Sequence, residues 1–190
     1  MRSQNFTIMK KLGIQLFIGV FAVLFSLQVN AQDKPAPSPL GKVYQRVGVT
    51  DMEVTYSRPS VKGRTIFAAD GLQAYGKLWR TGANGATKIS FSTDVMIGGK
   101  KVAAGDYSIF SIPGADEWTL IFNTDAAQRG TGSYTKDKDA VRLMVKPIEY
   151  PSNVETMTIA FANVKDTSTD LVILWEKTMI AVPITVEKTW

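Results

Sequence analysis

The sequence contains no cysteine and no histidine. The absence of cysteine excludes disulfides, thiolate metal sites, a cysteine nucleophile and the lipidated cysteine of a lipoprotein anchor. The absence of histidine excludes the Ser-His-Asp triad, imidazole general bases and histidine metal sites. Any catalysis would have to use carboxylate, lysine, tyrosine or arginine side chains. We therefore predict no cofactor and no metal site, leave enzymatic activity open, and favour a protein that is not an enzyme.

The first 31 residues have the pattern of a signal peptide. A basic start precedes an apolar run over residues 12–27, and Val29 and Ala31 occupy the −3 and −1 positions of a small-residue cleavage site before Gln32. The run is about 16 residues long, which is shorter than the roughly 20 residues of a membrane-spanning helix. We therefore predict cleavage after Ala31, no stable membrane span in the mature chain, and a periplasmic or secreted location.

The basic character of the sequence comes partly from this segment. The chain has 22 lysines and arginines against 17 acidic residues, a net charge of +5. Cleavage after Ala31 removes Arg2, Lys10 and Lys11 and no acid, so 19 basic residues remain and the net charge falls to +2. So small an excess gives no support to a nucleic-acid partner. No feature of the sequence indicates an oligomeric state.

Alternation of apolar and polar residues dominates the rest of the chain, which is the pattern of β-strands. Residues 32–39 form a proline-rich tether, and we predict one β domain over residues 40–190. The alternation is clear in residues 118–122 and again in residues 180–186, where Pro183 predicts an edge strand. No window of helical length shows an apolar stripe with the helical period.

Nine or ten short strands separated by turn residues predict an all-β fold. We expect an antiparallel β-sandwich with one long structured loop, and a closed β-barrel is the alternative.

Two long stretches interrupt the alternation, over residues 58–86 and 124–138. Loops of this length in a small domain are usually functional or disordered. The second stretch is polar and typical of a mobile loop. The first contains several aromatic residues, which disfavour disorder, and glycines that permit close backbone approach. We therefore place the candidate functional site in the first stretch.

Positive charge is concentrated in this first loop, where Asp70 is the only acid. A guanidinium group binds carboxylate or phosphate oxygens with two parallel hydrogen bonds. An adjacent tryptophan offers an aromatic plane to a sugar ring or a cation. The loop therefore predicts a site for an anionic small molecule or a glycan, with five contact residues: Arg58, Arg64, Trp79, Arg80 and Asn84.

The same arginines have a structural alternative, in which they form ion pairs with acids such as Asp106, Glu117 and Glu155 and pin the loop down. A third hypothesis is a histidine-free hydrolase that uses paired carboxylates, as glycosidases do. No acid stands in a motif that identifies it, so no catalytic residue is predicted. A ligand-binding module is our leading hypothesis, with the hydrolase and a structural envelope protein as its alternatives.

Several strings of residues resemble a family of exported bacterial domains. They are YSRP at 56–59, KGR at 62–64, YGKLWRTGAN at 75–84, AGDYSIFSIP at 104–113 and EW at 117–118. The family is catalogued as a domain of unknown function, DUF2911, and is found mainly in Bacteroidetes-type bacteria. The resemblance runs from about residue 39 to residue 186. It implies export and a single β domain, and it assigns no catalytic residue.

Overall fold

The computed structural model describes residues 35–188. The predicted signal peptide, residues 1–31, and the first part of the predicted tether lie outside the described residues. Residues 35–39 contain no strand and are mostly exposed. Within residues 35–188, no helix is long and apolar enough to cross a membrane.

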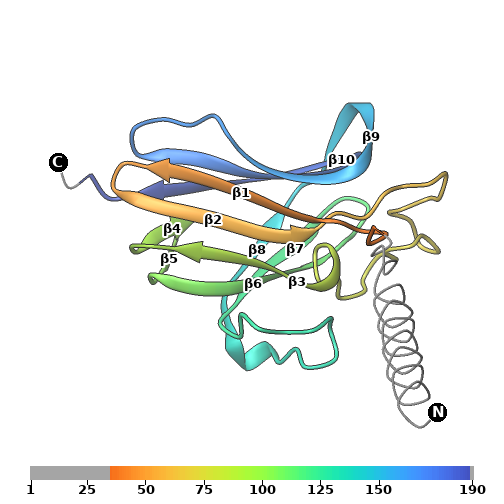
Figure 1. Cartoon of the computed structure of the whole chain (residues 1–190), viewed down its shortest axis with the longest axis horizontal. Coiled ribbons are helices and arrows are strands. Elements are labelled where there is room, and N and C mark those ends of the chain that lie inside the picture. Colours follow the sequence, from red (N-terminus) through yellow and green to blue (C-terminus); the bar gives the residue numbers. More distant parts are fainter. Residues whose placement is uncertain (1–34, 189–190) are drawn as a thin grey trace, which may run out of the picture. The chain divides into compact units, whose positions relative to one another are not determined.

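Ten antiparallel strands form two separate sheets, so the predicted β-sandwich is confirmed and a closed barrel is excluded (Figure 1). The larger sheet has the strand order β1-β2-β3-β6-β7-β8, and the smaller has the order β5-β4-β10-β9. The strands are β1 (Leu40–Val47), β2 (Thr50–Ser57), β3 (Ala83–Phe91), β4 (Val95–Ile97), β5 (Lys100–Val102), β6 (Gly105–Ile112), β7 (Trp118–Asn123), β8 (Asp139–Val145), β9 (Ile148–Ala162) and β10 (Ser168–Val186), with one short 3-10 helix, η1 (Lys136–Lys138).

The core lies between the two sheets and follows the alternation of the sequence. Because successive side chains of a strand point to opposite faces, every second residue of β2, and of β3 from Thr87 onward, is buried. Met52 and Val54 of β2 lie beside Phe91 and Ile89 of β3 in the strand register, and all four belong to the buried cluster. Burial of these apolar side chains is the main force that holds the sheets together.

The hairpin of β4 and β5 joins the two sheets at one edge. Gly98 and Gly99 both have positive φ, at 53° and 78°, which suits the tight turn of a hairpin. A Cβ atom on Gly98 would lie 3.0 Å from the side chain of Leu143 in β8. Lys100 Nζ donates a hydrogen bond to the carbonyl of Arg142, also in β8. The hairpin therefore connects the edge of the small sheet to the edge of the large one.

The chain joins the sheets again where β2 ends. The amide of Val61 donates to the carbonyl of Glu155 in β9 at 2.8 Å, and the amide of Met157 donates to the carbonyl of Pro59 at 2.9 Å. Just before this segment, the Tyr56 hydroxyl accepts a hydrogen bond from the amide of Ile159 at 2.9 Å. The long loop therefore begins fastened to the opposite sheet.

Two segments that the sequence separates, residues 171–175 and 180–186, form the single bent strand β10. The register with β9 shifts on both sides of Glu176, which has a left-handed φ of 55°. In the strand order β10 lies between β4 and β9, so the prediction of an edge strand was wrong for β10 as a whole. Pro183 is nevertheless tolerated, because the registered pairs with β9 end at Met179 and those with β4 begin at Ile184. Its carbonyl accepts a hydrogen bond from the amide of Gly98 at 3.0 Å.

Candidate functional site

Trp79 belongs to the core and does not face solvent. It is 2 % exposed, and its ring stacks on Trp175 of β10 with a centroid distance of 5.7 Å and an interplanar angle of 25°. Phe67 of the same loop packs edge-on against Trp118 at 4.7 Å. Trp79 Nε1 donates to the carbonyl of Gly82 at 2.9 Å. A ligand cannot stack on a ring enclosed in this way, so we assign Trp79 to packing and remove it from the candidate site.

The backbone of Trp79 extends the large sheet beyond β3. Its amide and carbonyl both pair with Ser111 of β6, at 2.7 and 2.8 Å. In an extended segment neighbouring side chains point to opposite faces. Since Trp79 points into the core, Arg80 points to the outer face of the large sheet. The sequence analysis groups Trp79 and Arg80 in one site because they are adjacent in the chain, but their side chains lie on opposite faces of the sheet.

The residue after Arg80 has an uncommon backbone conformation. Thr81 has a φ of 51°, which is costly for a β-branched residue and persists only where the surroundings impose it. Its hydroxyl lies 3.0 Å from the hydroxyl of Ser111, and its carbonyl accepts a hydrogen bond from Thr87 Oγ1 at 2.6 Å. These buried contacts fix the backbone next to Arg80.

Arg58 and Arg64 hold the loop in place through neutral acceptors. Arg58 Nε donates to the carbonyl of Met157 at 3.0 Å, and its Nη2 donates to Thr158 Oγ1 at 3.1 Å. Arg64 Nε donates to the carbonyl of Val61 at 2.9 Å, and its Nη2 reaches the carbonyl of Ser60 at 2.6 Å. Both side chains therefore fasten the start of the loop, Arg58 to β9 and Arg64 to the loop itself.

The acids proposed as partners of these arginines are occupied elsewhere or lie apart. Asp106 forms an ion pair with Lys88 at 2.7 Å. The hydrogen bonds from Lys88 and Ser90 hold the pKa of the Asp106 carboxyl below its usual value. Glu155 accepts a hydrogen bond from the amide of Lys62 at 2.9 Å. Among residues 35–188, no ion pair joins an acid to a loop arginine, so the predicted carboxylate clasps do not form.

Arg80 differs from the other two arginines. The residue is half-buried, and its Nε is enclosed without a hydrogen-bond partner in the described part of the chain. Buried N–H groups are nearly always paired, and an unpaired one costs about 1–3 kcal/mol. The Arg80 side chain is therefore a positioned donor and a positive charge that the described residues do not neutralise.

Asn84 lies near Arg80 at the start of β3. It is exposed and has a left-handed φ of 58°, and its Nδ2 donates to Ser57 Oγ at 3.2 Å. The amide of Thr87, three residues further along β3, donates to the carbonyl of Arg80 at 3.2 Å. The backbone of Arg80 is therefore bonded to β3, whereas the Asn84 side chain is bonded to the end of β2.

The loop over residues 124–138 is anchored beside this same end of β3. The amide of Ala86 donates to the carbonyl of Gln128 at 3.1 Å. Tyr134 packs edge-on against Phe110 with a centroid distance of 5.1 Å. The sequence predicts only a polar mobile loop here, because nothing in its local pattern reveals these distant partners.

A buried network holds the far end of that loop. Asp139 accepts hydrogen bonds from the Tyr134 hydroxyl at 2.7 Å, Arg142 Nη1 at 2.7 Å and Asn123 Nδ2 at 2.8 Å. Burial and the Asp139 carboxylate both raise the pKa of the Tyr134 hydroxyl. Because a well-connected buried network is rigid, the loop has a fixed end at β8.

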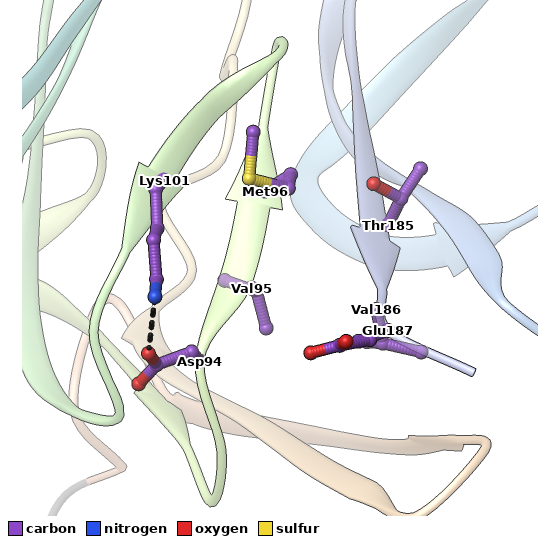
Figure 2. Close-up of a pocket in the computed structure, with 7 residues that line it drawn as sticks. All are labelled: Asp94, Val95, Met96, Lys101, Thr185, Val186 and Glu187. Carbon is purple, nitrogen blue, oxygen red and sulfur yellow. Dashed lines mark ion pairs between the residues drawn. The ribbon is translucent and has the colours of Figure 1, made fainter. Parts of the chain in front are cut away.

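A separate pocket of about 370 Å³ lies against the paired strands β4 and β10, at the C-terminal end of β10. Figure 1 shows this end of β10 and the loop between β2 and β3 at opposite ends of the sandwich. Figure 2 shows that Asp94 and Lys101 face each other at the rim, where they form an ion pair at 3.1 Å. The lining residues are Asp94, Val95, Met96, Lys101, Thr185, Val186 and Glu187, none of which is a predicted contact residue.

The charge of Asp94 in this pocket is already satisfied by the protein. Its carboxylate accepts a hydrogen bond from the amide of Ala104 at 3.0 Å. That bond and the contact with Lys101 hold the Asp94 pKa below its usual value. Within the described residues, no group of three or more acidic side chains is arranged to hold a metal ion.

The comparison with family models gives one match, over residues 38–184, to the family described as "Protein of unknown function (DUF2911)". The comparisons with curated proteins and with solved structures found no match. The matched span includes the loop between β2 and β3, the start of β3 and the loop over residues 124–138. With most of its length matched, the chain belongs to the DUF2911 family, whose function is unknown.

Proposed function

We propose that this protein is an exported β-sandwich module that binds an anionic small molecule or an anionic glycan through Arg80, assisted by Asn84. The observation that carries the proposal is the enclosed Arg80 Nε, which has no partner in the described part of the chain. Arg58 and Arg64 support the site by fixing the loop. Trp79 supports it from the core by fixing the backbone next to Arg80.

The chemistry of the guanidinium group favours an oxyanion as the ligand. Its positive charge is spread over three nitrogens, so an oxyanion on the Nη groups also compensates the charge on the enclosed Nε. Charge-assisted hydrogen bonds of this kind are about twice as strong as neutral ones. Asn84 adds an exposed amide that can hydrogen-bond either a sugar hydroxyl or an oxyanion.

The test is the conservative variant Arg80→Lys, with Arg46→Lys as the matched control. Arg46 is an exposed arginine of β1 whose only ion pair within residues 35–188 is a long one of 3.7 Å with Asp51. A thermal-shift screen against anionic metabolites and glycans identifies a ligand, because selective binding raises the melting temperature. Calorimetry then measures its affinity for wild type and for both variants.

We expect Arg80→Lys to weaken binding at least tenfold without lowering the melting temperature of the free protein, because lysine lacks the two-pronged geometry. Arg46→Lys should bind like wild type. If Arg80 serves only to hold the loop in place, Arg80→Lys will instead lower the melting temperature of the free protein by several degrees. That result, or unchanged binding by Arg80→Lys, would refute the proposal.

A further inference from the structure

The outer face of the large sheet is covered over β6 and β7 by the loop over residues 124–138. Phe110 of β6 and Ile121 of β7 are fully buried, although neither belongs to the core between the sheets. They pair in the strand register, and the ring of Tyr134 packs on Phe110. The loop therefore forms a second layer against this face. Arg80 lies on the same face, and its Nε is enclosed.

Two adjacent residues of β3 connect this loop to Arg80. The amide of Thr87 donates to the carbonyl of Arg80, and the amide of Ala86 donates to the carbonyl of Gln128. Arg129 follows Gln128 directly and is exposed. The backbone of Arg80 and the backbone next to Arg129 are thus both hydrogen-bonded to neighbouring residues of β3.

The charge of Arg129 is not neutralised in the described part of the chain. Lys138 of the same loop pairs with Asp125 at 2.8 Å, and Arg142 pairs with Asp139 at 2.7 Å. Arg129 forms no ion pair among residues 35–188. Lys138 is thus paired within the loop, whereas the Arg129 guanidinium is left available for a ligand.

We infer that Arg129 is a second binding residue of the Arg80 site and that the ligand group is a dianion, either a phosphate monoester or a dicarboxylate. This inference rests on the proposed function. Two guanidinium groups that face one ligand favour two negative charges over one, because each adds its own charge-assisted hydrogen bonds. The hydrogen bond between Ala86 and Gln128 fixes the backbone next to Arg129, so that only its side chain must be ordered on binding.

The absence of histidine makes a pH titration an unusually clean test of this inference. A phosphate monoester changes from monoanion to dianion near pH 6. No ordinary side chain other than histidine titrates between pH 5 and pH 8. A change in affinity over this range therefore reports the charge of the ligand.

The probes are methyl phosphate, succinate and acetate, measured by NMR titration of the folded protein at pH 5 and pH 8. We expect wild type to bind methyl phosphate about tenfold more tightly at pH 8 than at pH 5. Wild type should bind the monoanion acetate more weakly than methyl phosphate at pH 8. Arg129→Gln should abolish the pH difference for methyl phosphate, whereas the control Arg46→Gln should behave like wild type. Succinate binding as tight as that of methyl phosphate at pH 8 identifies a dicarboxylate ligand, and much weaker succinate binding identifies a phosphate monoester.

The outcomes separate the two proposals. If Arg129→Gln keeps its native circular dichroism spectrum and the full pH difference, the inference is overturned. The proposed function then still stands, provided that Arg80→Lys weakens the binding of any of the probes. If wild type binds none of the three probes at either pH, this inference is overturned, and the Arg80→Lys screen alone decides the proposed function.

Discussion

Trp79 and Arg80 are neighbours in the sequence with opposite surroundings in the fold. Their sequence context, a glycine-rich loop with several cations, predicts that both are exposed and act together. Their actual orientation depends on the β-bridge between Trp79 and Ser111, which extends the sheet by one residue pair and turns Trp79 inward. A single bridge leaves no alternation in the sequence, so the inward direction of Trp79 could not be predicted. The basic character of the loop could be predicted, because it depends on composition alone.

The burial of Trp79 leads to a prediction about stability. Trp79→Ala should lower the free energy of unfolding by about 3–5 kcal/mol, because it opens a cavity in the aromatic cluster. Leu72→Ala in the same loop is the control. Leu72 is 44 % exposed, and its loss should cost no more than about 0.5 kcal/mol. Urea denaturation measures both values, and equal costs for the two variants would contradict the packing role of Trp79.

The alternation of apolar and polar residues predicts where the strands lie, but it does not predict how the segments between them are arranged. The positions of β6, β7 and β8 could be predicted to within a few residues because each has apolar residues at every second position or on both faces. The continuity of β10 could not, since Glu176 gives no sequence signal of a left-handed residue within a strand. The loop over residues 124–138 was predicted to be mobile because its anchors, Ala86 and Phe110, are distant in sequence.

The hairpin of β4 and β5 supplies a prediction at this scale. Gly98→Ala and Gly99→Ala both place an alanine at a positive φ, which costs roughly 1–2 kcal/mol in each case. Only Gly98 also faces a neighbour, the buried side chain of Leu143 in β8, whereas a Cβ on Gly99 meets nothing within 4 Å. Gly98→Ala should therefore be about 1 kcal/mol less stable than Gly99→Ala.

Thermal or urea unfolding of the two variants measures that difference. Equal stability would mean that Leu143 moves aside without cost and that the hairpin is only loosely joined to β8.

For the whole molecule, the sequence was sufficient for the architecture but not for the site. Two facing sheets follow from many short amphipathic strands and the lack of a helical pattern. The proposed site depends on which residues of separate loops meet, and the backbones of Arg80 and Gln128 come near each other only because both hydrogen-bond to β3, far along the chain from Gln128. Arg129 therefore could not be identified from sequence, although its position beside Gln128 in a glycine-containing loop was visible.

Export is tested on the whole chain. We expect the exported form to begin at Gln32, because Ala31 ends a short apolar segment that follows a basic start. Intact mass and N-terminal sequencing of protein recovered from the periplasm or the medium measure the start directly. A mature product that retains residues 12–27 would contradict this prediction and indicate a membrane anchor.

The stacked pair of Trp79 and Trp175 also gives the molecule an optical property. Two indole rings at this separation couple their excited states, and such coupling produces paired circular dichroism bands of opposite sign. Trp79 belongs to the loop, whereas Trp175 belongs to β10 and Trp118, 6.3 Å from Trp79, belongs to β7, so we expect these bands only while the loop is docked on the sandwich. Circular dichroism of the unlabelled protein should therefore report whether the loop that carries Arg80 is packed on the sandwich.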